Sequence, residues 1–195
     1  MAVLDLTLSA VDLAPLLVGA LLTDAGVTVR LTEVEAYAGS DDPAAHAFIG
    51  LRPRTKDLFG PPGTLYCYLS HGLHTCGNVV CGAAGGGSAV LLRAGRVVAG
   101  IDIVRQRRPG VPDRALARGP GNFGRALGWT LADSGRRFDG DLELEPGAAV
   151  GPVLAGPRVG VSVAHQRPWR FWAEGDPTVS AYRPSPRITP GHLDW

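Results

Sequence analysis

Residues 27–37 (VTVRLTEVEAY) join an alternating apolar pattern to two glutamates. Because side chains alternate between the two faces of a strand, this pattern predicts a strand whose core-facing side continues into carboxylates. An ionised carboxylate is costly to bury unless it is paired, so a buried one here would be a candidate general base. The alternative is a strand end that leaves the core with both glutamates in solvent. The residues expected to share one face are Val27, Val29, Leu31, Glu33, Glu35 and Tyr37.

A chain of 195 residues with 45% hydrophobic and 19% charged residues predicts one globular domain with a substantial core. No apolar run reaches the roughly 20 residues of a membrane helix. Asp5 and Asp12, without early Lys or Arg, do not fit a signal peptide. Three cysteines favour buried thiols in a reducing compartment. We therefore expect a cytoplasmic protein without a membrane partner.

Arginine dominates the positive charge, since Lys56 is the only lysine among 19 basic residues. Arginine binds phosphate through two nitrogens and stacks on bases. Between residues 103 and 125, six arginines stand against the single acid Asp113. This segment predicts a basic face for nucleic acid. A solvated helix face explains the same composition equally well.

The pattern of turns and apolar runs predicts an α+β fold: a single domain over residues 1–195, with a curved antiparallel or mixed β-sheet and helices packed around it. A helix is expected at 9–22 with Ser9 as N-cap, and helical pieces at 100–128. Residues 38–63 are expected to be mostly loop, and residues 184–195 a loosely held tail. Strands are expected at 27–37, 64–69, 73–80, 89–92, 142–145, 157–163 and 169–173.

Two motifs invite a cofactor or a metal, and neither has the right context. Residues 119–124 (GPGNFG) match the dinucleotide fingerprint, but the polar segment before them does not read as a buried strand. We interpret them as a loop that feeds a helix N-terminus able to hold a phosphate. His71, His74, Cys76 and Cys81 lack the paired spacing of zinc ligands. We expect no metal and no cofactor.

Further residues have two interpretations each. Tyr66 and Tyr68 share one strand face, where they either pack or form a stacking platform for an unpaired base. Asn78 and Arg93 fit either a polar site or ordinary strand positions. Taken in order, the chain resembles the alkyladenine (3-methyladenine) DNA glycosylase family over almost its whole length. The resemblance is carried by residues 33–37 (EVEAY), 42–46 (DPAAH), 62–68 (PGTLYCY), 71–78 (HGLHTCGN), 90–94 (VLLRA), 119–121 (GPG) and 158–161 (RVGV).

The resemblance implies that a damaged purine leaves the duplex and enters a protein pocket. Tyr37, His46 and Tyr68 would enclose the base, and Asn78 would lie near purine C2 and reject guanine. Glu35 would activate a water that Arg93 and the backbone carbonyl of Val161 help to position, leaving an abasic site. His71 would fill the gap in the duplex, where relatives often carry tyrosine. The DNA backbone would be contacted by Arg118, Gly121 and Asn122. Asn122 stands at a position where relatives often carry lysine.

The expected partner is double-stranded DNA with alkylated or deaminated purines, bound by a monomer of bacterial type that associates with the nucleoid. Strand cleavage by a glycosylase needs an amine for a Schiff base, and the chain offers only Lys56 and the N-terminus. We therefore expect base release without lyase activity. Two alternatives stay open: a nucleic-acid-binding protein without catalysis, and a sugar glycosidase that uses Glu33 and Glu35 as acid and base.

Overall fold

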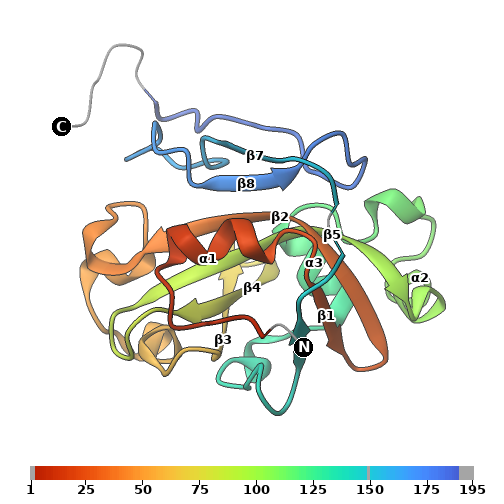
Figure 1. Cartoon of the computed structure of the whole chain (residues 1–195), viewed down its shortest axis with the longest axis horizontal. Helices are drawn as coiled ribbons and strands as arrows, with labels where there is room; N and C mark the ends of the chain where they lie inside the picture. The colour runs from red at the N-terminus through yellow and green to blue at the C-terminus, as the bar shows by residue number, and fades with distance from the viewer. Residues whose placement is uncertain (1–2, 149, 189–195) are drawn as a thin grey trace.

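The computed structural model describes residues 3–148 and 150–188. Its eight strands form one sheet (Figure 1), and every pairing between them is antiparallel. The expected single-domain α+β class is confirmed, and the sheet is antiparallel rather than mixed. The strands are β1 (Leu21–Asp24), β2 (Val27–Ala38), β3 (Leu65–Ser70), β4 (His74–Cys81), β5 (Ser88–Ala99), β6 (Glu143–Glu145), β7 (Val153–Gly156) and β8 (Arg170–Ala173).

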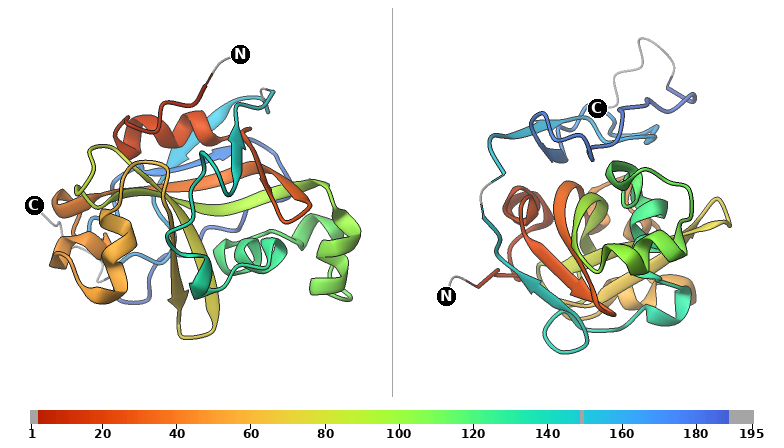
Figure 2. Two further views of the ribbon diagram at one scale, coloured as in Figure 1. Left: turned by 90° about the horizontal axis from the view of Figure 1, so that it is seen from below. Right: turned by 90° about the vertical axis from the view of Figure 1, so that its right-hand side faces the viewer.

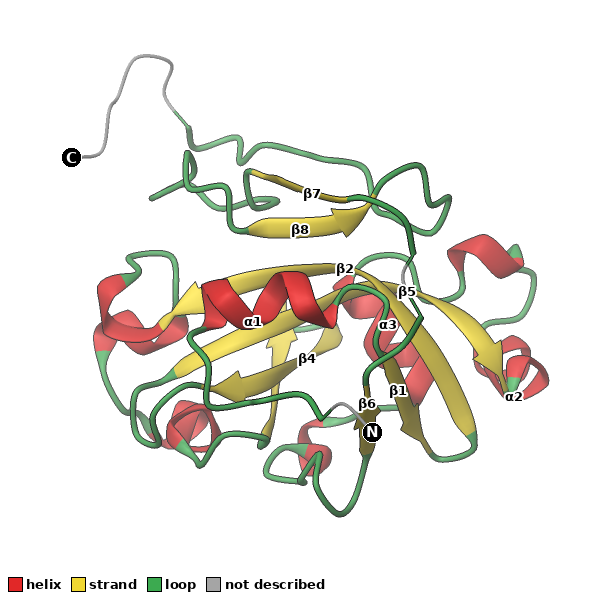
Figure 3. Cartoon of the chain, in the orientation of Figure 1, coloured by secondary structure: helices red, strands yellow, loops and turns green. Residues whose placement is uncertain are grey.

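Strand β2 is the centre of the sheet. The order is β3-β4-β5-β2-β1-β6, with β8 joining at β2 and β7 joining at β8. On one edge β2 pairs with β5; on the other it pairs first with β1 and then, from Glu33 to Glu35, with β8. The sheet therefore forks at these two glutamates, and the paired strands β7 and β8 branch from β2 there (Figures 1 and 3).

The strand expected at 27–37 is confirmed, but its alternation is broken by bulges. The register between β2 and β5 skips Thr32 on β2 and then Arg93 on β5. One extra residue reverses which face the following side chains occupy. Leu31 before the bulge and Val34 after it both belong to the hydrophobic core, and Glu35 therefore points to the other side. The expectation of one face shared from the start of the strand through Glu35 is wrong for this reason.

Helix α1 (Ala10–Leu17) begins as predicted at Ser9, whose hydroxyl accepts the N–H of Asp12 at 3.2 Å. The expected helix over 9–22 is too long, because the chain turns after α1 and continues as β1. The apolar run is continuous in the sequence because α1 and β1 both face the core; Leu22 of β1 has no exposed area.

Helical pieces at 100–128 are confirmed as α2 (Ile101–Arg107) and α3 (Pro120–Leu127). Helix α3 packs against β4, and α1 covers β2 (Figures 1 and 2). The remaining helical elements are short 3-10 helices, and three of them lie in the long loop at 38–63. They are η1 (Gly39–Asp41), η2 (His46–Ile49), η3 (Pro53–Phe59), η4 (Asp113–Ala115) and η5 (Leu131–Asp133).

The late strands are partly as expected. Those at 142–145 and 169–173 are confirmed as β6 and β8, but 157–163 is not a strand, and the strand of this region is β7. The chain leaves β7 in irregular backbone because Arg158 enters a fully buried ion pair with Asp42. Residues 184–188 have no regular secondary structure; the rest of the expected tail, 189–195, lies outside the described residues.

Two hydrophobic clusters hold the sheet. The larger lies between α1, the central strands and α3, with fully buried residues such as Leu13, Leu31 and Phe123. The smaller joins η2 and η3 to the far ends of β3, β4 and β5, and includes Leu58, Tyr66 and Val80. In the part of the chain that the structure describes, no helix is long and apolar enough to cross a membrane.

Candidate active site

Glu33 lies at the fork of the sheet with no exposed area and with both carboxylate oxygens engaged in hydrogen bonds. Its Oε1 accepts Arg93 Nε at 2.8 Å, Arg170 Nε at 2.7 Å and the Ser180 hydroxyl at 2.9 Å. Its Oε2 accepts the Ser180 amide at 2.7 Å. Burial raises the pKa of Glu33, but the charges of Arg93 and Arg170 and the Ser180 amide outweigh burial and hold the pKa below its usual value. Glu33 is therefore an ionised residue that fixes two arginines.

Arg93 joins the two glutamates. The bulge in β5 directs its side chain between them: Nε donates to Glu33, and Nη1 donates to Glu35 Oε2 at 3.3 Å. Bulges commonly redirect a side chain in this way. Burial lowers the pKa of Arg93, but the adjacent carboxylates of Glu35 and Glu33 raise it further, so the guanidinium stays charged.

Glu35 has no exposed area and accepts three hydrogen bonds from three different parts of the fold. Oε2 accepts the Tyr37 hydroxyl at 3.0 Å in addition to Arg93, and Oε1 accepts the backbone N–H of Val159 at 2.7 Å. The second of the two alternatives for the strand end, with both glutamates in solvent, is therefore wrong.

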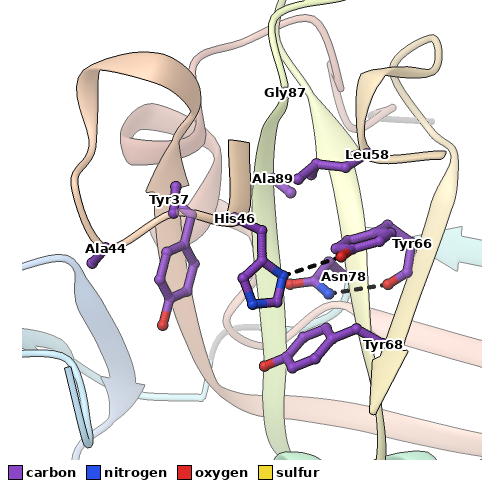
Figure 4. A pocket seen from close by; sticks show the side chains of 10 residues that line it. Tyr37, Ala44, His46, Leu58, Tyr66, Tyr68, Asn78, Gly87 and Ala89 are labelled. Carbon is purple, nitrogen blue, oxygen red and sulfur yellow. Dashed lines mark hydrogen bonds between the residues drawn. The ribbon is translucent and has the colours of Figure 1, made fainter. Parts of the chain in front are cut away.

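An aromatic cavity adjoins Glu35. Rings of Tyr37, His46 and Tyr68 face it (Figure 4), and Tyr66 and Asn78 complete the wall at β3 and β4. Its empty volume, counted to the open mouth, is about 410 Å³. Glu35 does not itself line the cavity; its carboxylate lies behind Tyr37, whose hydroxyl links the two.

The aromatic residues hold one another. The His46 ring meets Tyr68 edge to face at 4.6 Å between centroids, and Tyr66 stacks on Tyr68 at 6.0 Å. His46 Nδ1 is 3.1 Å from the Tyr66 hydroxyl. Tyr66 and Tyr68 share a strand face as predicted, because Leu65 and Cys67 lie in the larger core on the opposite side.

The titratable side chains that line the cavity are uncharged at neutral pH. Burial, and then the charge of Arg54, lower the pKa of His46, so its imidazole is neutral at pH 7. Burial raises the pKa of Tyr66 to about 12 and raises that of Tyr68 still further. Burial and the neighbouring Glu35 carboxylate raise the pKa of Tyr37 well above its usual value. The phenols are thus hydrogen-bond donors.

Asn78 is oriented by the backbone. Its Nδ2 donates to the carbonyl of Tyr66 at 3.0 Å. The amide oxygen consequently lies on the His46 side of the cavity (Figure 4). Asn78 is only 5% exposed, so it is a fixed polar contact on an otherwise aromatic wall.

His71 lies at the tip of the β3–β4 hairpin and lines a second, open pocket that shares His46, Tyr66 and Tyr68 with the aromatic cavity. Its φ of 51° is in the left-handed region, and the tip projects from the molecule in both views of Figure 2. Leu69 and Leu73 on either side are 46% and 76% exposed. The hairpin tip is therefore an exposed, partly apolar projection beside the cavity.

The N-terminus of α3 stands behind the hairpin. Pro120 is the first residue of this helix and Gly119 is its N-cap, which confirms a loop that feeds a helix rather than a dinucleotide fingerprint after a strand. A Cβ on Gly121 would approach His74 to 2.6 Å, so glycine permits close packing here. Asn122 donates to the Arg118 carbonyl at 2.7 Å, and Arg118 donates to the Val179 carbonyl at 2.9 Å.

The arginine-rich segment is less free than its composition suggests. Arg105 pairs with Asp102 and Asp113, and Arg107 and Arg108 donate to backbone carbonyls. Arg114 and Arg125 are exposed. Arg105, Arg107 and Arg108 are therefore tied to neighbouring groups of the molecule, although Arg105 and Arg107 stay exposed.

Several site residues carried no signal in the local pattern. Val159 supplies an amide to Glu35, and Val161 follows two residues later in the same irregular loop, half-buried. Arg170 and Ser180 bind Glu33 from across the fork. Arg170 and Ser180 could have been predicted only from the pairing of β8 with β2. Within residues 3–148 and 150–188, no group of three His, Cys, Asp or Glu side chains is placed to hold a metal ion.

A deeply buried carboxylate, a charged arginine and an aromatic cavity therefore lie together at one place in the fold. The model of the methylpurine-DNA glycosylase (MPG) family matches residues 5–177, and the chain belongs to this family. Methylpurine-DNA glycosylases are hydrolases of N-glycosyl bonds.

Similar proteins carry the provisional name 3-methyladenine DNA glycosylase. One from Cutibacterium acnes is 49% identical over 92% of this chain and 99% of its own. Another from Nocardia farcinica is 53% identical over 88% of this chain and 86% of its own. A third, from Mycolicibacterium paratuberculosis, is 50% identical over 97% of each chain.

Proposed function

We propose that the protein excises alkylated or deaminated purines from double-stranded DNA by base flipping, acting as a monomer. The observation that carries the proposal is the Glu35 carboxylate, held by three donors directly behind the aromatic cavity. Extrusion of a base costs a few kcal/mol, and damage lowers this cost. The cavity between Tyr37 and the His46–Tyr68 pair accepts the extruded purine, which stacks on the rings.

Glu35 acts on a water that enters between Tyr37 and Arg93, the two side chains that contact Oε2. The carboxylate takes a proton as the water oxygen attacks C1′, and the C1′–N bond breaks with its electrons passing to the purine. Positive charge develops on the sugar, and a fixed carboxylate stabilises it. Arg93 orients Glu35, and the Val161 carbonyl helps to orient the water. The products are a free purine and an abasic site.

The geometry favours this reaction over a sugar glycosidase. An acid–base pair needs one protonated carboxyl group, and both groups must reach opposite sides of the bond. Glu33 is not a protonated acid, since its pKa is held low. It is also not free to reach a substrate, since two arginines and Ser180 occupy its oxygens. Of these two glutamates, Glu35 is the one connected to the cavity, through the Tyr37 hydroxyl.

Strand cleavage is not expected. A lyase step needs an amine at the sugar. Lys56 is exposed on η3 and does not line the cavity. Base release by water therefore ends the reaction at the abasic site.

Around the cavity, the remaining contacts fit a duplex. The exposed hairpin tip with His71 fills the gap left by the extruded base, because apolar side chains readily separate base steps. Arg118, Gly121 and Asn122 approach the phosphates from the start of α3. Asn78 disfavours guanine, whose exocyclic amino group meets the fixed amide at the wall.

The test is base release from duplexes with 3-methyladenine, hypoxanthine, 7-methylguanine or ethenoadenine, read by alkali cleavage at abasic sites. Wild-type protein should release at least one of these bases. Glu35→Gln should bind the same duplex and release none, while Glu143→Gln, at an exposed glutamate on β6, should match wild type. Intact lesion DNA under tight binding by wild type would instead favour the non-catalytic binding protein. Full activity in Glu35→Gln would refute the assignment.

A further inference from the structure

A second buried ion pair lies beside the site, between two segments far apart in the sequence. Asp42 follows β2, and Arg158 lies between β7 and β8; neither side chain has any exposed area. Arg158 Nη2 donates to Asp42 Oδ1 at 2.9 Å, and Nη1 donates to Oδ2. Because desolvation offsets the attraction of such a pair, it adds little net stability. The role of this ion pair must therefore be inferred from the groups that Asp42 and Arg158 contact.

Arg158 contacts the wall of the cavity and the carboxylate behind it. Its Nη1 also donates to the Ala36 carbonyl at 3.0 Å, and its guanidinium lies 4.6 Å from the centroid of the Tyr37 ring. The next residue, Val159, donates its N–H to Glu35. Displacement of Arg158 would therefore move the Tyr37 ring and a donor of Glu35 together.

Asp42 fixes the opposite wall. Its Oδ1 accepts the N–H of Ala44 at 3.2 Å, and its carbonyl accepts the N–H of Ala45 at 2.8 Å. This turn delivers His46, the next residue, to the cavity. The ion pair thus connects the wall that carries Tyr37 to the wall that carries His46.

We propose that Asp42 and Arg158 are positioning residues for base excision, which keep Tyr37, His46 and the Val159 amide in register with Glu35. The proposal rests on the proposed function of the site. Neither residue lines the cavity, and both act through the groups they hold.

The chain supplies a matched control. Asp24 is also a buried carboxylate in a two-point pair with an arginine, Arg136, at 2.8 and 3.0 Å, and it accepts Trp129 Nε1 at 2.8 Å. None of these residues contacts the cavity or Glu35. Asp42→Asn and Asp24→Asn therefore make the same chemical change at a buried carboxylate, although the Arg136 side chain is 30% exposed and the Arg158 side chain is not exposed. Only the first change touches the site.

The first readout is the single-turnover rate of base release with protein in excess, corrected for the folded fraction. Asp42→Asn should slow this rate by about 10- to 100-fold, because displacement of about 1 Å has that effect on an aligned reaction. Asp24→Asn should leave the rate unchanged although it lowers the melting temperature. Equal slowing in both variants, or a wild-type rate in Asp42→Asn, would overturn the proposal.

The second readout does not depend on activity. The 2.7 Å bond to a carboxylate should shift the Val159 amide proton downfield in the NMR spectrum. Asp42→Asn should move this resonance upfield and Asp24→Asn should not; an unmoved resonance contradicts the proposal even if wild type releases no base. If Asp42→Asn does not fold, Arg158→Lys replaces it, since lysine keeps the charge but loses the two-point contact. The same two readouts, the rate of base release and the Val159 amide resonance, then test the proposal.

Discussion

Substitution of Glu33 by glutamine tests whether the fork of the sheet is held by charge. The change leaves the guanidinium groups of Arg93 and Arg170 buried, with side chains 7% and 5% exposed, and removes the carboxylate that both contact. Removal of one member of a buried ion pair destabilises a protein by about 3–5 kcal/mol. Because both arginine side chains are almost fully buried, solvent screens the interaction little, and this loss of stability needs no large reduction. For a domain of this size the melting temperature should fall by roughly 6–20 °C.

The assay is urea denaturation of wild type, Glu33→Gln and Glu35→Gln under the same conditions. Glu35→Gln should lose much less stability, because Arg93 keeps Glu33 as its partner. The two variants therefore separate support of the fold from chemistry. The reasoning would be refuted if Glu33→Gln stayed within ~0.5 kcal/mol of wild type, the range of ordinary surface changes. It would equally fail if both variants lost the same stability.

Two further predictions concern pH and packing. Because the pKa of Glu33 is lower in the folded protein, its stabilisation is present above the unfolded value of about 4.5 and is lost as the pH falls through the folded value. The unfolding free energies of wild type and Glu33→Gln should therefore converge in acid; parallel curves would contradict this. In α3, a Cβ on Gly124 would lie 2.1 Å from the Thr75 carbonyl oxygen. Gly124→Ala should lose about 3 kcal/mol by overpacking, which exceeds the ~1 kcal/mol gain in helix propensity. Gly140→Ala, in open space, should melt like wild type.

Local patterns predicted most of the fold. Strand β2, the β3–β4 hairpin, β8 and the Ser9 cap follow from alternation, turn residues and capping chemistry, which act over a few neighbouring residues. Errors arose where local and long-range signals differ. The apolar run through β1 reads as a continuation of α1, and the segment at 157–163 reads as a strand although Arg158 is drawn out of it by Asp42.

The candidate site divides in the same way. Glu35, Tyr37, His46, Tyr68 and Asn78 stand in motifs that the sequence displays, and their contacts in the cavity agree with that grouping. The roles assigned to these residues, and those assigned to His71, Val161 and Asn122, stay predictions.

The sequence by itself determined most of the strands, that the chain folds as one α+β domain, and which family it resembles. Only the tertiary structure decided how its buried charges are paired. Arg93, Arg170 and Ser180 reach Glu33 from 60, 137 and 147 residues away. Such partners depend on two bulges and on where β8 joins β2, and the chain can satisfy a buried charge only after these distant segments meet.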